Sequence, residues 1–543
     1  MGAYGGLVLG PVRIVTPALL LTVALLGCSA GGGIKEAAGV RLADGQIRGG
    51  MFSVSAEEPE HLMPADATTT ADGQVVSALF TGLVEYDPQT AEPRNAMAES
   101  ITSPDQQTWT IRIKPGWTFH NGEPVTARSF VDAWNFAAYA PNANGNASYF
   151  DKVEGYADLQ SDHPAKKELS GLRVVDDTTF TVRLVDRFGQ FPVMLGFQAF
   201  YPLPRAAYGD RRAYEEAPIG NGPFEMDGRW RHDEFIRLKR FPAYKGRPPS
   251  ADAVEFRIYS KPGGGYEDLL AGSLDIATDI PPDQLAAARA EFSKGFVERR
   301  SSAFNYLGFP LWDRRFSRKE LRQALSLAID REAIVKAIYD GTREPAHSVI
   351  NPLVPGSRPD ACGLCSFDPA RARRLLAAAG GWSGPLDLWF PESPENQPAI
   401  EAVANMLRAN LGIGDVRFHV FDFAQFLSLV KARQVDGPFF SNWLMDYPSP
   451  QSYLAPLYSA GASTNRTGYA NPVVDRRIAE GDRAPTMAAA IVAYQAAEDV
   501  ILDDMPVIPL WFNKTRAVHG DRVTQVAIDP FSRIRVQDVQ VVG

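Results

Sequence analysis

The sequence lacks the motifs that mark several common classes of enzyme. It contains no H-E-x-x-H, no G-x-S-x-G and no G-x-x-x-x-G-K-[ST], and its seven histidines offer few candidates for a metal site or a catalytic triad. His120 precedes an Asn-Gly turn, where we expect it to cap or pack rather than to catalyse. The sequence therefore predicts a protein that is not an enzyme and that needs no cofactor and no metal.

Runs of basic residues are also absent. The 543 residues include 55 Lys and Arg against 64 Asp and Glu, which gives a formal net charge of −9. A mildly acidic chain without a basic cluster is not expected to bind nucleic acid, and it has no polybasic patch for a membrane surface. Beyond the N-terminus, no apolar stretch reaches the roughly 18 residues that suggest a membrane-spanning helix.

A short apolar run stands near the N-terminus. Residues 14–26 carry no charge and follow Arg13, and the run is too short to span a bilayer but suits the h-region of a secretory signal. Its end, Leu-Gly-Cys at 26–28, resembles the bacterial lipobox. We therefore predict a signal peptide at 1–27, lipidation of Cys28 and a flexible tether at 28–49, which would anchor the protein at the extracytoplasmic face of the cell membrane. The alternative is an ordinary secretory signal with an incidental cysteine.

Cysteine is scarce, and only two residues remain once Cys28 is assigned to the lipid. Cys362 and Cys365 form a C-x-x-C in a loop rich in proline and glycine. Zinc would need two more ligands, and no second pair accompanies them, while a redox dithiol is expected between a strand and a helix. For an exported protein the pair predicts a local structural disulfide.

Strand-like and helix-like segments alternate irregularly along the chain. Alternation of apolar and polar residues predicts four strands, at 108–114, 179–184, 235–239 and 254–259. Helical spacing predicts five helices, at 127–139, 320–339, 368–379, 400–411 and 487–502. This mixture indicates an α/β protein and not a β-sandwich or a helical bundle.

One continuous stretch resembles a known family. Residues 95–127 read NAMAESITSPDQQTWTIRIKPGWTFHNGEPVTA, which is similar to the signature of the extracytoplasmic solute-binding proteins, family 5, that serve dipeptide and oligopeptide ABC importers. Shorter segments match the same family in order: 80–84, 220–224, 321–331 and 469–475. The resemblance covers the chain from about 51 to 543.

This resemblance implies a fold and a division into lobes. The expected fold is a two-lobed α/β structure of the periplasmic-binding-protein type II kind, with an additional small domain and a cleft that closes at a hinge. Lobe I is placed at 50–85, 216–308 and 506–543, the inserted small domain at 86–215, and lobe II at 309–505.

The resemblance also implies where a peptide would be held. Peptide-binding members have a W-x-x-D-Y segment whose Asp holds the amino terminus of the ligand, and here that residue is Asp446. A buried ammonium needs a charged, hydrogen-bonding partner. The backbone of Trp443, Leu444 and Met445 would pair with an extended peptide, as in β-strand addition. The alternative for Asp446 is a solvated loop residue.

Other candidate residues are less firmly placed by the resemblance. The strand opposite the ligand maps to residues 68–71, which include Thr69, Thr70 and Ala71. Asn305 and Tyr306 either face the cleft or pack at the hinge. Trp443 and Tyr447 are either ligand-pocket aromatics or core residues.

The expected function is that of the substrate-binding component of an ABC importer. Its partners would be short peptides, a permease and ATPase subunits, and the membrane through the lipid anchor, and we expect a monomer. The first alternative keeps the fold but changes the ligand to haem, a nickel chelate or an oligosaccharide. The second is a structural or adhesive lipoprotein, which would need no closing cleft.

Overall fold

The computed structural model describes residues 40–41 and 47–542. The predicted signal peptide, Cys28 and most of the predicted tether lie outside this range. Among the helices in the described range, none is both long enough and apolar enough to cross a bilayer.

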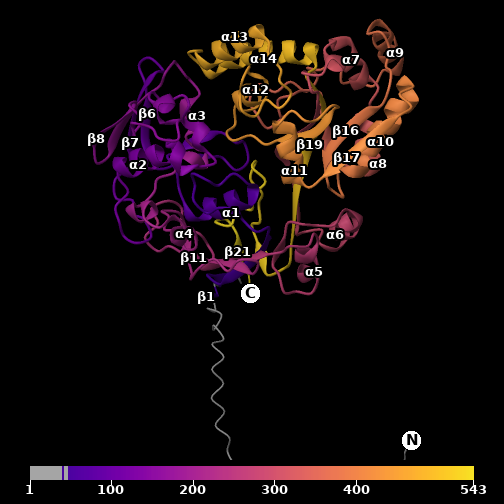
Figure 1. Ribbon diagram of the computed structural model, residues 1–543. Helices are drawn as coiled ribbons and strands as arrows, with labels where there is room; N and C mark the ends of the chain where they lie inside the picture. The colour runs from indigo at the N-terminus through magenta and orange to yellow at the C-terminus, as the bar shows by residue number, and fades with distance from the viewer. Residues whose placement is uncertain (1–39, 42–46, 543) are drawn as a thin grey trace, which may run out of the picture. The chain divides into compact units, whose positions relative to one another are not determined.

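An eleven-stranded mixed sheet organises the described chain (Figure 1). Ten of the strands follow one another in the order β10-β11-β12-β3-β13-β19-β14-β18-β16-β17, and β15 pairs with β19 off this path. Their bounds are β3 Met51–Ala56, β10 Phe224–Met226, β11 Phe235–Arg240, β12 Ala253–Ile258, β13 Ile276–Ala277, β14 Phe296–Gly308, β15 Arg343–Pro345, β16 Leu386–Pro391, β17 Val416–Phe421, β18 Phe439–Trp443 and β19 Val507–His519. The predicted strands at 235–239 and 254–259 are confirmed as β11 and β12.

Two long strands join the two halves of this sheet. β14 and β19 have 13 residues each and pair antiparallel, with register shifts between Arg300 and Phe304 and between Asn305 and Tyr306. β13 pairs with one end of β19, whereas β18 pairs with the far end of β14, from Phe304 to Gly308. The two long strands therefore run through both halves of the sheet.

The hydrophobic core is divided in the same way. One large cluster of buried side chains draws almost entirely on residues 52–276 and 517–541, and a second draws almost entirely on residues 304–512. Each half of the sheet thus has its own core. The lobe boundaries given above stay a prediction.

The half whose core is drawn from residues 52–276 and 517–541, called the first half below, carries a separate four-stranded antiparallel sheet. Its strands follow the order β6-β7-β9-β8. The predicted strands at 108–114 and 179–184 are confirmed as its two central strands, and the predicted helix at 127–139 is confirmed as α2, Ala127–Ala138. Trp134 of α2 is fully buried and packs edge-on against Phe180 of β9 at 5.5 Å between ring centroids. The strands of this sheet are β6 Ala98–Thr102, β7 Thr108–Ile113, β8 Leu172–Asp176 and β9 Thr179–Arg183.

The prediction of one long helix at 320–339 is wrong. The structure has α7, Lys319–Leu327, and then α8, Arg331–Ile338. Asp330 caps α8 because its side chain accepts a hydrogen bond from the amide of Ala333. The buried Arg331 side chain turns back to donate to the carbonyl oxygens of Ser326 and Ile329, each at 3.2 Å. These contacts end the first helix and start the second.

The other predicted helices are found close to their expected bounds. Asp368 caps α9 through the amide of Arg371, as its position before a proline suggests. The remaining helices are α1 Thr70–Leu79, α3 Phe191–Met194, α4 Arg211–Glu215, α5 Gly264–Leu270, α6 Leu285–Glu291, α9 Pro369–Ala378, α10 Gln397–Leu411, α11 Phe423–Lys431, α12 Gln451–Tyr458, α13 Pro472–Asp482 and α14 Met487–Asp504. Short strand pairs complete the structure, β1 Val40–Arg41 with β2 Ile47–Arg48, β4 Val84–Tyr86 with β5 Pro93–Asn95, and β20 Val523–Thr524 with β21 Gln540–Val541.

Candidate functional site

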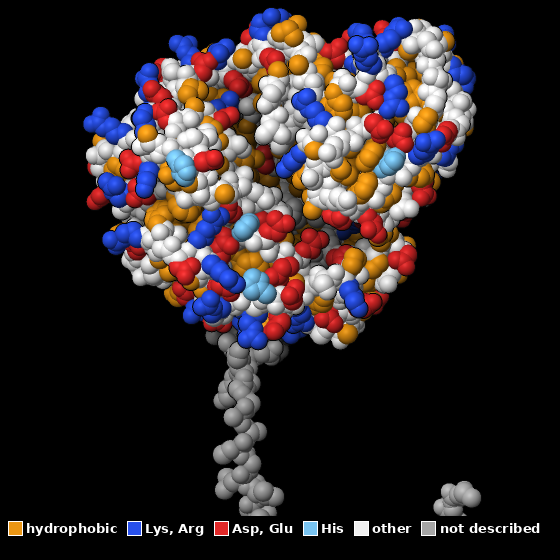
Figure 2. Space-filling model, viewed as in Figure 1, with side chains coloured by type: hydrophobic (Ala, Val, Ile, Leu, Met, Phe, Trp, Pro, Cys, Tyr) orange, Lys and Arg blue, Asp and Glu red, His pale blue; other side chains and the backbone are white. Residues whose placement is uncertain are grey.

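A cavity of about 400 Å³ lies between segments of both halves of the sheet. On the face seen in Figure 2 the surface is hollowed in its middle. The lining combines the segment after β18 with the start of α1, a loop near 146 and part of the C-terminal segment. Its residues are Thr68, Thr69, Thr70, Gly73, Tyr86, Gly145, Asn146, Ser148, Tyr149, Gly196, Phe197, Gln198, Asn442, Trp443, Leu444, Met445, Asp446, Ser463, Thr464, Phe531 and Arg533.

Asp446 brings a carboxylate into this cavity with one oxygen left free. Its amide donates to the Ser452 hydroxyl at 3.0 Å, which fixes the backbone. Its Oδ2 is buried and has no hydrogen-bond partner among the described residues. Burial raises the pKa of Asp446 to about 7, and a hydrogen bond with Tyr149 opposes part of the rise. The structure therefore places a buried carboxyl group here, and one of its oxygens is available to accept a hydrogen bond from a ligand.

The backbone beside Asp446 is free to pair with a ligand. β18 ends at Trp443, whose indole nitrogen donates to the Ser452 carbonyl at 2.7 Å. The amide and carbonyl of the next residue, Leu444, have no hydrogen-bond partner within the described range. Met445 lines the cavity too, although its side chain is 2% exposed. The backbone at Leu444 therefore continues β18 with an amide and a carbonyl that have no partner in the described range.

The prediction of a strand at 68–71 is wrong, because this segment begins a helix. Thr69 is the N-cap of α1, and it forms a capping box with Asp72. The fully buried Asp72 also accepts hydrogen bonds from the amides of Glu60, at 2.7 Å, and of Thr68, at 2.9 Å. The start of the helix still lines the cavity through residues 68–70, but Ala71 does not line it.

Three of the remaining candidates are mainly structural. Tyr447 does not line the cavity; it is 5% exposed, packs in the core of the first half and donates a hydrogen bond to Gln451. Tyr306 is 2% exposed and stacks on Phe304. Asn305 donates to the Asn513 side chain at 2.7 Å and lines a neighbouring cavity. Asn305 and Tyr306 thus lie in the core of the long-strand pair.

The C-terminal segment supplies site residues that the sequence did not reveal. Arg533 lines the cavity and forms an ion pair with Asp529 at 2.8 Å, while its guanidinium lies over the Phe531 ring. Phe531 in turn packs against Tyr86, with ring centroids 5.2 Å apart. No motif marks the stretch 529–535, so only the folded chain brings it to the site.

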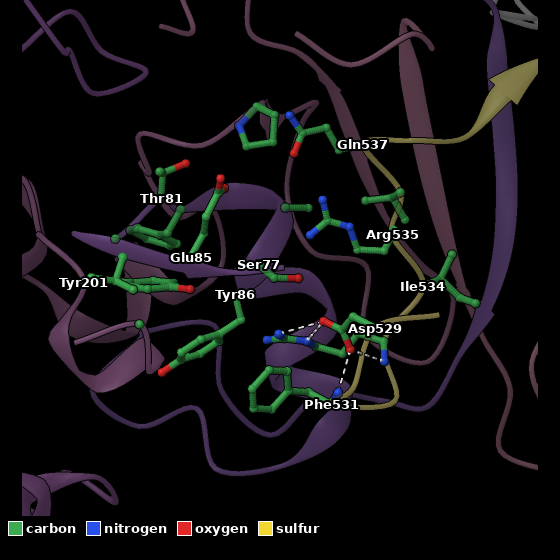
Figure 3. Close-up of a pocket in the computed structure, with 18 of the residues that line it drawn as sticks. Ser77, Thr81, Glu85, Tyr86, Tyr201, Asp529, Phe531, Ile534, Arg535 and Gln537 are labelled. Carbon is green, nitrogen blue, oxygen red and sulfur yellow. Dashed lines mark hydrogen bonds and ion pairs between the residues drawn. The ribbon is translucent and has the colours of Figure 1, made fainter. Parts of the chain in front are cut away.

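Behind these residues lies a second cavity, of about 100 Å³ (Figure 3). Tyr86, Phe531 and Arg533 line both cavities and so form the wall between them. Arg535 points into the smaller space in Figure 3, and the Asp529–Arg533 contacts are drawn there as dashed lines. The smaller cavity is thus an immediate neighbour of the main one.

One cluster of possible metal ligands is found in the described range, and its members are already paired. His61, Asp66 and Glu215 place one ligand atom each within 4.8 Å of one another. His61 lies 3.2 Å from Glu215, and Arg211 forms an ion pair with Asp66. Since a cation of the chain itself occupies this cluster, it fits a structural role.

Two predicted features lie away from the cavity. Cys362 and Cys365 form a disulfide, with 2.00 Å between the sulfur atoms, and line none of the cavities described. His120 accepts a hydrogen bond from the Gly220 amide at 3.0 Å, and burial lowers its pKa to about 4. His120 is therefore a neutral packing residue.

Comparison with known proteins identifies the family. The family model described as bacterial extracellular solute-binding proteins, family 5 (middle), matches residues 92–465. The chain belongs to this family. Two relatives are each 25% identical to it: the dipeptide-binding protein DppE of Bacillus subtilis, over 95% of this chain and 96% of the relative, and the glutathione-binding protein GsiB of Escherichia coli, over 88% and 92%.

Solved structures show the same fold. The murein tripeptide binding protein MppA of Escherichia coli matches with a TM-score of 0.79 and 22% identity, over 93% of this chain and all of MppA. OppA of Haemophilus influenzae, solved in complex with the peptide RPPGFSPFR, matches with a TM-score of 0.77 and 23% identity, over 92% and 100%. The family 5 chain therefore has the predicted α/β fold of the periplasmic-binding-protein type II kind.

Proposed function

We propose that this family 5 protein captures short peptides, of two or more residues, and delivers them to the permease of an ABC importer. The observation that carries the proposal is the buried Oδ2 of Asp446, which has no hydrogen-bond partner in the described part of the chain and lies in a cavity of about 400 Å³. In this proposal Asp446 binds the free α-ammonium group of the peptide, and the protein performs no chemistry on it.

The physical basis is the cost of an unpaired buried charge. A carboxylate taken out of water without a partner is destabilising by several kcal/mol, and an ammonium that reaches it restores both charges to a hydrogen-bonded pair. A charge-assisted bond of this kind contributes about 1.5–3 kcal/mol. A free amino end is thus selected over a blocked one.

Main-chain pairing would complete the recognition without reading side chains. Leu444 has an amide and a carbonyl with no partner in the described range. An extended peptide offers the complementary groups at every residue, whatever its sequence. The threonines at 68–70 lie across the cavity and can add hydroxyl contacts. A receptor for many peptide sequences is the expected result.

The proposal extends to the whole assembly. The two lobes and inserted small domain, with the bounds predicted above, would close over the peptide about β14 and β19. Closure is then the state that the permease and its ATPase subunits would recognise. The lipid on Cys28 would hold the receptor, acting as a monomer, at the outer face of the cell membrane.

A non-peptide solute, such as haem, a nickel chelate or an oligosaccharide, is the alternative ligand for the same fold. Asp446 favours a cationic group over haem or a neutral sugar. Because one relative is a glutathione-binding protein, modified peptides also belong to the candidate ligands.

Native mass spectrometry of the full chain, isolated from a peptide-rich medium, tests the proposal. We expect a heterogeneous set of added masses that fit short peptides, and loss of these masses in Asp446→Asn. Asp283→Asn, which removes an exposed carboxylate outside the cavities described, is the matched control and should keep them. A single discrete adduct, or none, with Asp446→Asn unchanged, would instead indicate a non-peptide solute.

A further inference from the structure

The two halves of the protein also meet through residues outside β14 and β19. The end of α13 belongs to the second half, whose core is drawn from residues 304–512, and it contacts the loop before α3 in the first half. There the amide of Gly189 donates to the carbonyl oxygen of Asp482 at 2.8 Å. Figure 1 shows α13 close to α3 near the top of the view. We call this contact the seam; it joins residues 106, 152 and 186–190 to residues 449 and 482–485.

Two side chains of the first half reach across the seam. The Gln106 amide nitrogen donates to the carbonyl oxygens of Ala484, at 3.1 Å, and of Pro485, at 3.2 Å. The Lys152 ammonium group forms an ion pair with Asp482 at 3.3 Å, and the two side chains are 27% and 15% exposed. Both contacts join one half of the protein to the other.

The seam extends from a buried hydrogen bond to an exposed ion pair. The Ser449 hydroxyl donates to the Gln190 side-chain oxygen at 3.2 Å, and both residues are buried. Arg483 pairs with Asp186, but both of these side chains are more than half exposed. Because an exposed ion pair contributes little, the shielded contacts supply most of the stability of the seam.

Gly189 shows how closely the two backbones approach. A Cβ atom at this position would lie 2.9 Å from the carbonyl oxygen of Ala484 and 3.2 Å from the side-chain nitrogen of Gln106. Gly189 does not have a positive φ, so the lack of space, and not its backbone conformation, requires a glycine. A larger residue at 189 would therefore push the second half away from the first.

The seam lies outside the proposed ligand cavity. None of its residues is among the described residues that line the cavity at Asp446. The seam instead borders a separate cavity of about 110 Å³, whose lining includes Lys152, Asp186, Asp482 and Arg483. A peptide held at Asp446 does not touch the seam, so the seam can affect binding only through the arrangement of the two halves.

We infer that the seam is a latch, which holds the two halves together when the protein closes and so strengthens the binding of every peptide without contacting any of them. This inference rests on the proposed function, in which the halves close over a peptide. A protein that opens at the seam loses all of these contacts, because each joins one half to the other. The seam therefore adds to the stability of the closed form, and a larger closed population gives tighter binding.

The latch affects affinity and not selection. In the proposed function Asp446 distinguishes a free amino end from a blocked one by contact with it, whereas the seam contacts neither. A change at the seam should therefore weaken the binding of all peptides by the same factor.

Gly189→Ala tests the latch, because the added methyl group collides with the second half. The Kd would be measured by calorimetric titration of the full chain with a pool of tetrapeptides with randomised side chains, and with the same pool N-acetylated. We expect Gly189→Ala to raise both Kd values roughly tenfold and to leave their ratio as in the wild type. Gly414→Ala is the matched control, since a Cβ atom at this exposed glycine meets nothing within 4 Å, and it should bind as the wild type does.

Two further variants cover the case in which Gly189→Ala disturbs folding. Gln106→Asn shortens the side chain by one methylene group at a position where φ is 59°, which asparagine tolerates. Lys152→Met keeps an apolar stem over the Phe188 ring but removes the ammonium group. Each should raise the Kd about two- to fivefold, with urea unfolding close to that of the wild type.

Hydrogen exchange of the wild type distinguishes a latch from a permanent contact. The amide of Gly189 is bonded across the seam, so the segment 186–190 should exchange more slowly when the tetrapeptide pool is bound. Equal protection with and without the pool would show that the seam does not open, and it would overturn the latch.

The binding data separate the latch from the proposed function. Tight binding of the pool with an unchanged Kd in all three seam variants would refute the latch alone. A change in the ratio of the two Kd values would also refute it, because the seam would then take part in selection. Failure of the wild type to bind any peptide would refute the proposed function, and the latch with it.

Discussion

Asp446 differs from the buried Asp72 and Asp529 in what its oxygens contact. Asp72 is fully buried, but backbone amides satisfy both of its oxygens, so it holds the start of α1. Asp529 is likewise held by Arg533. Asp446 instead has one buried oxygen without a partner in the described residues. This contrast separates a residue available to a ligand from residues that support the fold.

Peptide binding should have a pH optimum between about 7 and 8. The pKa of Asp446 is about 7, so at lower pH its carboxyl is protonated and must lose that proton before it can pair with an ammonium. By about pH 8, near its own pKa of roughly 7.7–8.0, the peptide's amino group has lost its proton in about half of the molecules. We expect the Kd for a peptide pool to be roughly twentyfold higher at pH 5.5 than at pH 7.5.

Calorimetry at the two pH values measures this difference. In Asp446→Asn, titrated at higher protein concentration, the dependence below pH 7 should be absent. Equal affinity of the wild type at pH 5.5 and 7.5 would contradict the role of Asp446 as the amine's partner.

At the scale of elements, Arg331 ties three segments together. Its guanidinium donates to the carbonyl of Pro509 in β19 at 2.6 Å and to that of Cys365 in the disulfide loop at 2.7 Å, besides those of α7 and the turn that follows it. The side chain is 2% exposed. One residue thus joins the break between α7 and α8 to the long strand β19 and to the loop that the disulfide closes.

Arg331→Met should destabilise the protein by about 3 kcal/mol or more, because it leaves several buried carbonyl oxygens unpaired. Urea unfolding measures this loss, and Arg314→Met, at an exposed arginine, is the control. Arg331→Lys should recover only part of the stability, since an ammonium cannot reach all of the carbonyls that the fork reaches. Unchanged stability of Arg331→Met would show that these hydrogen bonds are dispensable.

The elements also show where sequence patterns succeed and fail. Strict alternation located β7, β9, β11 and β12, and helical spacing with an Asp-Pro start located α9. The apolar pattern of 320–339 runs through two helices, so periodicity alone did not reveal the break. At 68–71 the strand was expected from the family resemblance, but Thr69 and Asp72 form a capping box that starts a helix. In both segments local side-chain hydrogen bonds decide the structure.

At the scale of the whole molecule, β14 and β19 are the shared connection between two cores. Most other main-sheet pairings lie within one half or the other. A ligand that contacts residues 68–70 on one side and residues 442–446 on the other gains contacts with both halves at once. In the proposed mechanism such a ligand would favour closure of the two halves through these additional contacts.

Small-angle X-ray scattering of the full chain should accordingly show a smaller radius of gyration when a pool of tetrapeptides with randomised side chains is added. Asp446→Asn should show no change at the same peptide concentration, because it lacks the contact that retains the ligand. Unblocked and N-acetylated pools compared side by side exclude a general effect of added peptide. A radius that does not respond to bound peptide would support a receptor without hinge closure.

The sequence alone determined the family and the α/β class, because long ordered motifs and local periodicity are properties of the chain itself. It also marked Asp446 as a candidate, since that residue lies inside a recognisable segment. Tertiary structure alone brought the C-terminal Arg533 to the same cavity and placed Arg343 and Arg516 near Glu395. These side chains are separated by up to about 190 positions, and no local pattern records which distant charges will share a cavity. Their burial and pairing are decided only when both halves of the sheet have formed.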